Sequence, residues 1–281
     1  MSTVTPVWVI ENFSKEQSYT ELKDAVTKAG HNIKELIGGY KVSDVKEFAT
    51  GKHCVIFCGS IEMTQLVRKE LENCYPVAYC TPENYLCSKY YTHFGSLLFN
   101  DKYAMLTLNE LHRQKFYYYR MFGKEALFFI RPDSGQKPFQ AQLLDLQDID
   151  RFCQNHKDVG HNLVLVSTPK TITGEYRFVC SKEKQVIAHS TYRFQSERTL
   201  IPAVPPGSLK KCKEVLEVGY YPDNVFVVDI GEDNDGNFWL MELDSFSSAG
   251  LYACDKDLIV KEVEKIAVRD FESAHWSVRL T

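Results

Sequence analysis

Three carboxylates lie close together near the end of the sequence, in the stretch VVDIGEDNDGNFWLMELD, residues 227–244. Asp229, Glu242 and Asp244 stand among Val, Phe, Trp, Leu and Met, at positions that usually go to buried residues and where an unpaired carboxylate is costly. A hard divalent cation would offset that cost, because Mg²⁺ prefers carboxylate and phosphate oxygens as ligands. These residue types therefore indicate a metal site.

The dipeptide Asp235-Gly236 favours a two-residue hairpin turn between two strands. A turn centred there places Asp229 directly opposite Glu242, with their Cβ atoms about 5 Å apart. Asp244 shares their face because side chains alternate along a strand. A one-residue bulge in the hairpin would break this alignment.

Two other interpretations fit the same stretch. If Glu242 is the twelfth residue of an EF-hand loop, Gly236 and Asp233 fall at the sixth and third positions, but Gly231 at the first position offers no ligand. The strand-like flanks also argue against an EF-hand. The second alternative is an acidic, solvent-facing hairpin edge without a ligand, and it stays open on this segment alone.

Basic residues recur on other predicted strands. FFIRPDSGQKPF carries Arg131 and Lys137 around a turn, and such a pair suits phosphate oxygens, although a surface cation pair is the commoner arrangement. GEYRFVC places Glu175 and Arg177 on one strand face, and AHSTYRF repeats the pattern with Arg193. Charged residues on successive strands, beside three acids, indicate a site where anions and a metal meet.

The chain that must position these residues begins with alternating strands and helices. Over about the first 90 residues this pattern is typical of a small parallel α/β unit. Gly59-Ser60 follows a strand and precedes a helix, where either a ligand loop or a helix N-cap is expected. The expected strands are 7–10, 53–61 and 77–80, and the expected helices are 18–29 and 63–74.

Beyond residue 95 the pattern changes to a mixed, largely antiparallel α+β region. Residues 103–115 are expected to form a helix, since Leu106, Leu108 and Leu111 stand among polar residues. The other expected helices are 146–156, 207–219 and 255–276. The expected strands are 126–132, 139–146, 162–167, 175–180, 185–194, 225–230 and 238–244.

The composition is that of an ordinary globular protein of 281 residues with a net charge of −4. The charge gives no global reason to expect nucleic-acid binding, and the clearest basic cluster, at 210–213, is interpreted as a solvated helix face. No stretch reaches the roughly 18 apolar residues of a membrane span, and no secretion signal is visible. Nine scattered cysteines without zinc spacing are expected to be reduced thiols of a cytoplasmic protein.

The order of the segments FIRPDSGQK, EYRF, AHSTYR, VVDIG and MELDSFSSAGLY resembles the ATP-grasp superfamily, especially its short RimK-like members from bacteria and phages. The resemblance covers about residues 95–281. It implies an α+β fold in which two antiparallel sheet subdomains, at about 115–165 and 166–281, sandwich a nucleotide. Residues 1–94 would form the small α/β domain that precedes the ATP-grasp.

The resemblance also implies roles for single residues. Arg131 and Lys137 would lie near the phosphates of ATP, and Leu165 and Val166 would offer backbone groups to adenine. Glu175 would bind ribose or instead orient Arg177. The catalytic residues would be Arg177 and Arg193, in contact with phosphate or the substrate carboxylate.

By the same resemblance, Asp229, Glu242 and Asp244 would bind Mg²⁺. The family motif usually ends in Glu-x-Asn, and Asp244 departs from it, but Asp still supplies an oxygen ligand. Arg131 stands where the family usually has Lys, which keeps the charge but changes the geometry. Neither departure argues against a working site.

The implied activity is that of an ATP- and Mg²⁺-dependent ligase that joins a carboxylate substrate to an amine acceptor through an acylphosphate. The sequence lacks the GxxxxGK[ST] motif of P-loop enzymes. The alternatives are a kinase or a nucleic-acid-directed ligase on the same fold, and a non-catalytic protein that binds nucleotide. The identities of acid and acceptor are left open.

Overall fold

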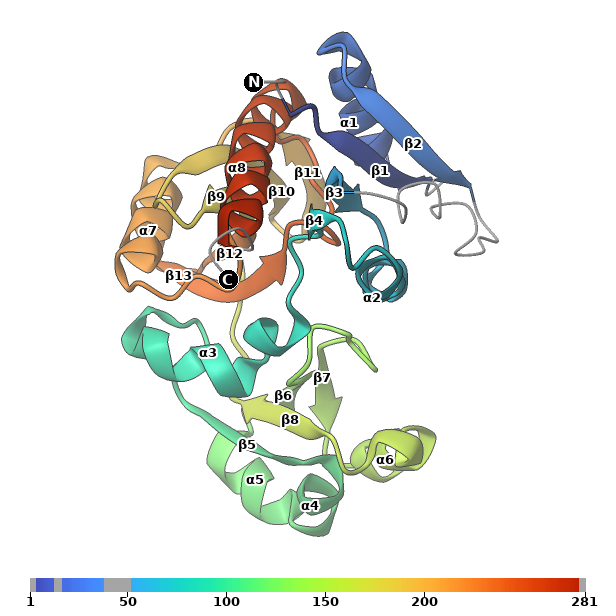
Figure 1. Cartoon of the computed structure of the whole chain (residues 1–281). Helices are drawn as coiled ribbons and strands as arrows, with labels where there is room; N and C mark the ends of the chain where they lie inside the picture. The colour runs from blue at the N-terminus through green and yellow to red at the C-terminus, as the bar shows by residue number, and fades with distance from the viewer. Residues whose placement is uncertain (1–3, 13–16, 38–51, 278–281) are drawn as a thin grey trace.

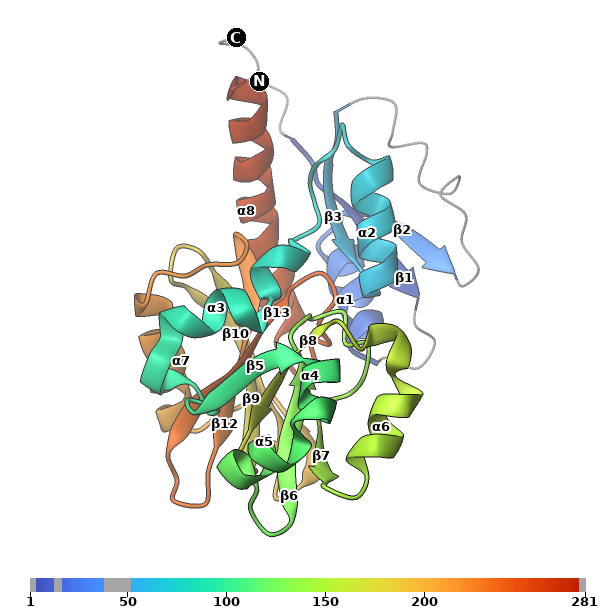
Figure 2. The same ribbon diagram turned by 90° about the horizontal axis from the view of Figure 1, so that it is seen from below.

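The structure is a computed structural model of the chain, and it describes residues 4–12, 17–37 and 52–277. Its framework is three sheets, which we call sheets A, B and C (Figure 1). Sheets A and B lie side by side in the upper part of Figure 1, and sheet C lies below them. Figure 2 looks at sheet C from below.

Sheet A is parallel, as the alternating pattern predicts. One face packs against helix α1 (Gln17–Lys28), which belongs to the buried cluster around Trp8, and the other packs against α2 (Ile61–Glu70). Ser60 is the N-cap of α2, since its Oγ accepts a hydrogen bond from the Met63 N–H at 3.2 Å. The strand order is β2 (Asn32–Ile37), β1 (Val7–Asn12), β3 (Cys54–Cys58) and β4 (Tyr75–Val77).

Sheet B is antiparallel and carries the acidic stretch on its last two strands. Helix α7 (Pro206–Glu217) and helix α3 (Cys87–Phe94) cover one face, where Phe178 and Phe226 are buried. The strand order is β11 (Glu197–Ile201), β10 (Val186–Phe194), β9 (Gly174–Ser181), β12 (Val225–Glu232) and β13 (Phe238–Ser245).

Sheet C is also antiparallel, and its outer face is covered by three short helices. These are α4 (Leu108–Arg113), α5 (Lys115–Phe122) and α6 (Ile149–Asn155). The strand order is β5 (Tyr103–Thr107), β8 (Leu163–Ser167), β6 (Leu127–Pro132) and β7 (Gln142–Asp145). Short 3₁₀ turns complete the fold at Pro82–Tyr85, Gly95–Leu97 and Lys157–Val159.

The last helix, α8 (Lys256–Ser277), lies between sheets A and B (Figure 1). Its buried residues share one core with strands of both sheets, including Trp8 of β1 and Val227 of β12. Glu264 accepts a hydrogen bond from the Trp8 indole at 2.7 Å, and Asp270 accepts one from the Tyr79 hydroxyl at 2.9 Å. Sheets A and B are therefore joined through this helix into one body.

Some predicted elements differ from the structure. Residues 103–107 form strand β5 rather than the start of a helix, because they pair along their whole length with β8, and such pairing overrides a weak helical spacing. The strand predicted at 77–80 lies earlier, at β4, and the sequence pattern does not predict strands β2 and β11. The division of the chain near residues 94 and 165 stays a prediction.

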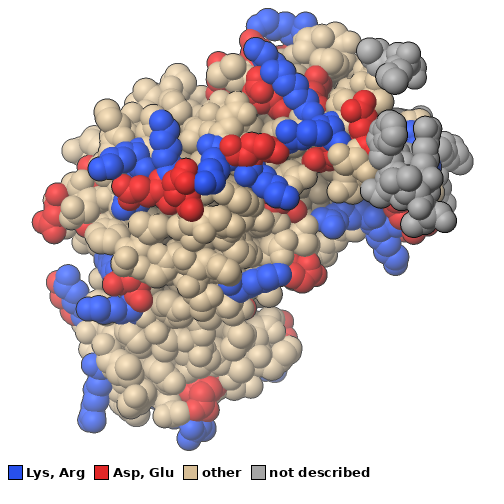
Figure 3. All heavy atoms as spheres, turned by 60° about the vertical axis from the view of Figure 1, so that its left-hand side comes forward, with Lys and Arg blue, Asp and Glu red and all other residues tan. Residues whose placement is uncertain are grey.

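Charged side chains of both signs are mixed on the face shown in Figure 3. Acidic and basic side chains alternate there with large uncharged areas, so this view of the described residues shows no extended basic surface for nucleic acid. No helix in the described part of the chain has the length and apolarity to cross a membrane.

All nine cysteines are free and buried, as predicted. Burial raises the pKa of Cys54 and Cys254 to about 12 and that of Cys153 to about 11. Such thiols carry roughly a hundredfold to a thousandfold less thiolate at pH 8 than ordinary ones. We expect the native chain to react with Ellman's reagent only over hours, and the urea-unfolded chain to release its full thiol signal within minutes. Fast reaction of the native chain would contradict this burial.

Candidate functional site

The acidic hairpin places its carboxylates as the sequence predicts. Asp229 of β12 pairs directly with Glu242 of β13, and Asp244 lies two residues further on the same face. The route to this register differs from the prediction. The loop spans residues 233–237 rather than two residues, and a β-bulge between these strands restores the expected pairing. The flanks are strands, so the hairpin is not an EF-hand.

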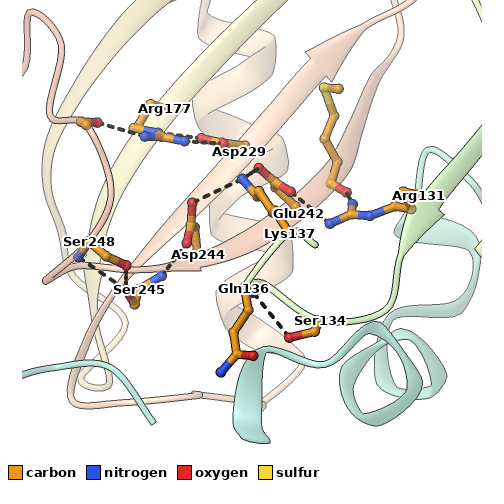
Figure 4. Close-up of polar contacts among 12 residues, drawn as sticks. Arg131, Ser134, Gln136, Lys137, Arg177, Asp229, Glu242, Asp244, Ser245 and Ser248 are labelled. Atoms are coloured by element: carbon orange, nitrogen blue, oxygen red, sulfur yellow. Dashed lines mark hydrogen bonds and ion pairs between the residues drawn. The ribbon is translucent and has the colours of Figure 1, made fainter. Parts of the chain in front are cut away.

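Two cations from sheet C reach this face of sheet B (Figure 4). The Arg131 Nη2 lies 2.9 Å from the Glu242 Oε2. The Lys137 Nζ lies 3.6 Å from the Glu242 Oε1 and 3.9 Å from the Asp244 Oδ2. The two carboxylates and two cations therefore form one cluster, which crosses from one antiparallel sheet to the other.

Arg131 has capacity for a further partner. Its side chain is largely buried, and its Nε has no hydrogen-bond partner among the described residues. A buried donor without a partner is expensive, so a native structure usually supplies an acceptor there. An anion or a polar ligand between the sheets would provide that acceptor.

The turn that carries Lys137 closes over the cluster. Ser134, Gly135 and Gln136 line a cavity of about 20 Å³ together with Asp244 and, from elsewhere, Ile61, Cys80, Pro82, Tyr85, Ser245 and Ser248. This volume holds no more than a water molecule. A ligand larger than water must therefore displace the turn, whose Lys137 has a positive φ of 49° that a non-glycine residue rarely adopts.

The ionisation of the two acids follows from their neighbours. Burial raises the pKa of Glu242, but the charges of Arg131 and Lys137 outweigh it and lower that pKa to about 2. For Asp244, burial dominates over the charge of Lys137, so the pKa of this carboxyl is raised. Glu242 is thus the carboxylate that stays ionised at any ordinary pH.

Asp229 points to a different partner. Its two oxygens accept hydrogen bonds from the Arg177 Nε at 2.9 Å and Nη2 at 2.6 Å, while the Arg177 Nη1 donates to the Gly250 carbonyl at 2.7 Å. The Arg177 guanidinium carbon also lies 5.5 Å from the ring centre of Tyr192 and 4.8 Å from that of Tyr252. Arg177 and Asp229 therefore form a buried ion pair that fixes the loop after β13.

This pair corrects the predicted metal site. No group of three or more His, Cys, Asp or Glu residues in the described part of the chain is arranged to hold a metal ion. Asp229 is engaged by Arg177, so the three-carboxylate set is not assembled. Glu242 and Asp244 remain as two oxygen donors with an ammonium beside both. This fits Mg²⁺, which proteins usually hold with one or two carboxylates plus substrate phosphates.

Glu175 and Arg193 form a second ion pair, with the Arg193 Nη1 3.0 Å from the Glu175 Oε1. A bulge in β10 at Tyr192 sets Arg193 opposite Glu175. Of the two roles considered for Glu175, orienting Arg177 is wrong, because Arg177 is held by Asp229. The Arg193 side chain is half-exposed and so can reach a ligand.

Leu165 and Val166 lie in the middle of β8, away from the position that their predicted role requires. Their backbones pair with β5 on one side and β6 on the other, so no backbone group is left for adenine. The predicted linking segment is therefore misplaced by a few residues. The chain crosses from sheet C to sheet B at residues 168–173, between β8 and β9.

A scan against models of protein families matches residues 108–261 to an ATP-grasp domain, the second family of its clade. The match covers more than half of the chain and includes strands of both antiparallel sheets. The chain belongs to the ATP-grasp superfamily. The ATP-grasp resemblance and the predicted fold class are therefore confirmed.

Solved structures agree with the ATP-grasp assignment at the level of the fold. D-alanine–D-alanine ligase from Bacillus anthracis matches with a TM-score of 0.64 and 12% identity over 97% of this chain and 100% of that one. A RimK domain ATP-grasp protein from Sphaerobacter thermophilus matches with 0.59 and 12% over 95% and 98%. The ligase PsnB, complexed with minimal precursor, Mg and ADP, matches with 0.56 and 13% over 93% and 98%. A search of curated proteins finds no match.

Proposed function

We propose that this ATP-grasp protein is an ATP- and Mg²⁺-dependent ligase that joins a carboxylate to an amine. The observation that supports it most is the cluster in which Arg131 and Lys137 of one sheet meet Glu242 and Asp244 of the other. A triphosphate between the sheets needs both cationic donors and a metal held by carboxylates. The family match supplies the nucleotide that such a cluster suits.

The proposed reaction has two steps. A carboxylate oxygen of the first substrate attacks the γ-phosphorus of ATP, the bond to the bridging oxygen breaks, and ADP leaves. The amine nitrogen of the second substrate then attacks the acyl carbon of the acylphosphate and loses a proton, while inorganic phosphate departs. Positioning and charge neutralisation carry such a transfer, so no covalent nucleophile on the protein is required.

Each residue of the cluster has a proposed part. Arg131 and Lys137 neutralise phosphate oxygens, and the free Nε of Arg131 supplies one more donor. Glu242 and Asp244 would hold Mg²⁺, which when bound neutralises charge on the transferred phosphoryl group. Arg193 is proposed to contact phosphate or the substrate carboxylate.

Two further proposals concern the nucleotide and the loop after β13. Residues 168–173 replace Leu165 and Val166 as the segment that lies against adenine, and Glu175 binds ribose. Arg177 is reassigned as a positioning residue, because each of its three guanidinium nitrogens already donates within the protein.

The test is turnover by the purified chain with MgATP and panels of carboxylic acids and amines, read as ADP, inorganic phosphate and product mass. A ligase releases ADP and phosphate only when both an acid and an amine are present. ADP without free phosphate, together with a phosphorylated product, would indicate a kinase instead. Nucleotide binding without turnover on any pair would indicate a non-catalytic protein.

The position of Lys137 gives a prediction that needs no substrate. Its ammonium lies beside both proposed metal ligands and so competes with a metal ion. We expect Lys137→Met to bind Mn²⁺ at least about tenfold more tightly than wild type without nucleotide, measured by electron paramagnetic resonance. Lys184→Met, which removes an exposed lysine paired with Glu217, is the control. Equal affinities in all three proteins would contradict this competition.

A further inference from the structure

A second cationic position lies on the edge of sheet B. In the antiparallel pair of β10 and β11, Arg193 and Arg198 face each other directly. Like charges at such a position destabilise a sheet unless an anion balances them. Glu175 balances Arg193, but Arg198 has no ion-pair partner among the described residues. The pair therefore has one carboxylate for two guanidinium groups.

Arg198 borders a cavity of about 230 Å³. The cavity lies where helix α1 of the parallel unit, the edge strand β11 and the loop after β13 come together. Polar and apolar groups both line it, which is typical of a small-molecule site. The lining residues are Gln17, Ser18, Glu21, Arg198, Leu200, Tyr252 and Ala253.

This cavity adjoins the cluster through an aromatic wall. Tyr252 stacks on Tyr192, with ring centres 4.8 Å apart and planes at 16°. The same Tyr252 ring lies 4.8 Å from the guanidinium carbon of Arg177, whose partner Asp229 faces Glu242 across the hairpin. The ion pair of Arg177 and Asp229 thus separates the cavity from the proposed phosphate site and fixes their mutual position.

The lining offers charge of both signs. Glu21 lies in the same wall, where it accepts from the Gln17 amide at 2.9 Å and pairs with the Lys256 Nζ at 3.0 Å. A carboxylate has about four lone-pair sites, so Glu21 can accept a further donor. Arg198 offers a fork of donors that suits a carboxylate. Leu200 and Tyr252 cover an apolar group between them.

We propose that this cavity binds a free amino acid, with its carboxylate on Arg198 and its ammonium group on Glu21, as the second substrate of the ligase. A ligand with both charges uses both groups, whereas a simple acid or a simple amine leaves one of them unused. The volume admits a small or medium side chain. The binding of the amino acid depends on the cavity alone, and its part in the reaction rests on the proposed function.

The test is isothermal titration of the wild-type chain, loaded with Mg²⁺ and a non-hydrolysable ATP analogue, with the proteinogenic amino acids one at a time. At least one is expected to bind, and acetate and ethylamine are expected to bind at least about tenfold more weakly. Arg198→Ala is expected to weaken amino-acid binding about 10- to 100-fold, the range for losing a charged hydrogen bond. Glu21→Gln is expected to weaken it about tenfold.

Arg151→Ala is the matched control, because it removes an exposed arginine, paired with Asp148, on helix α6. It should bind the amino acid as wild type does, and Arg198→Lys should retain more affinity than Arg198→Ala. The proposal is overturned if no amino acid binds, or if Arg198→Ala binds as tightly as wild type with an unchanged melting temperature. Failure of the proposed function is seen separately, as loss of analogue binding in the wild-type chain.

Discussion

Replacement of Glu242 by Gln is expected to lower ATP turnover at least about a hundredfold, the usual scale for a group that stabilises charge in the transition state. Glu242 is the acid that stays ionised, with a pKa of about 2, and it is the point where Arg131 of sheet C meets sheet B. Glutamine keeps the size of the side chain but can neither neutralise Arg131 nor hold a metal by charge. The measurement is the rate of ADP release under saturating MgATP.

The matched control is Glu217→Gln, which removes an exposed glutamate paired with Lys184 on the far helix α7. It should leave turnover within about twofold of wild type. Circular dichroism and melting temperature establish that both variants fold. A folded Glu242→Gln protein with wild-type turnover would remove Glu242 from the site and, with it, the proposed function.

Asp229→Asn is expected to destabilise the fold by about 3–5 kcal/mol, because it leaves the Arg177 charge buried without its partner. Arg177→Met should cost a similar amount for the converse reason. The double variant Arg177→Met/Asp229→Leu should lose less than either single change, since a buried ion pair can be replaced by apolar groups at little cost. Urea unfolding followed by tryptophan fluorescence measures all three.

The same variants separate two roles for Asp229. If Asp229 is a structural partner of Arg177, Asp229→Asn lowers stability, and Mn²⁺ binding by the folded protein stays near wild type. If it is a metal ligand, as the sequence suggests, Asp229→Asn keeps most of its stability and loses Mn²⁺ affinity. The first result is expected from the two short bonds to Arg177.

The sequence predicts strand faces well and strand neighbours poorly. Alternation along the last two strands suffices to place Asp229, Glu242 and Asp244 on one face, because side-chain period and hairpin pairing are local. The predicted cross-strand pair rests on a two-residue turn that the structure does not contain, and a bulge compensates for the difference. Which cation would meet each acid is not a local property.

Arg177 illustrates the limit. Its strand β9 lies between β10 and β12, so that Arg177 pairs with Asp229 in the ladder. Residues 177 and 229 are far apart in the chain, and only the strand order joins them. Sequence reasoning misses Arg198 for a related reason: β11 is short, and its alternation of Arg198 and Leu200 with more polar residues is too brief to be recognised without its partner strand.

The position of α8 has a consequence for how the chain is made. Sheet A comes from the first residues to be synthesised, yet one of its faces is completed by a helix that comes from the last ones. The nascent N-terminal unit therefore leaves the ribosome with an apolar face still open to water, and it cannot close that face until translation ends. Premature termination before α8 would release a chain prone to aggregation rather than a stable fragment.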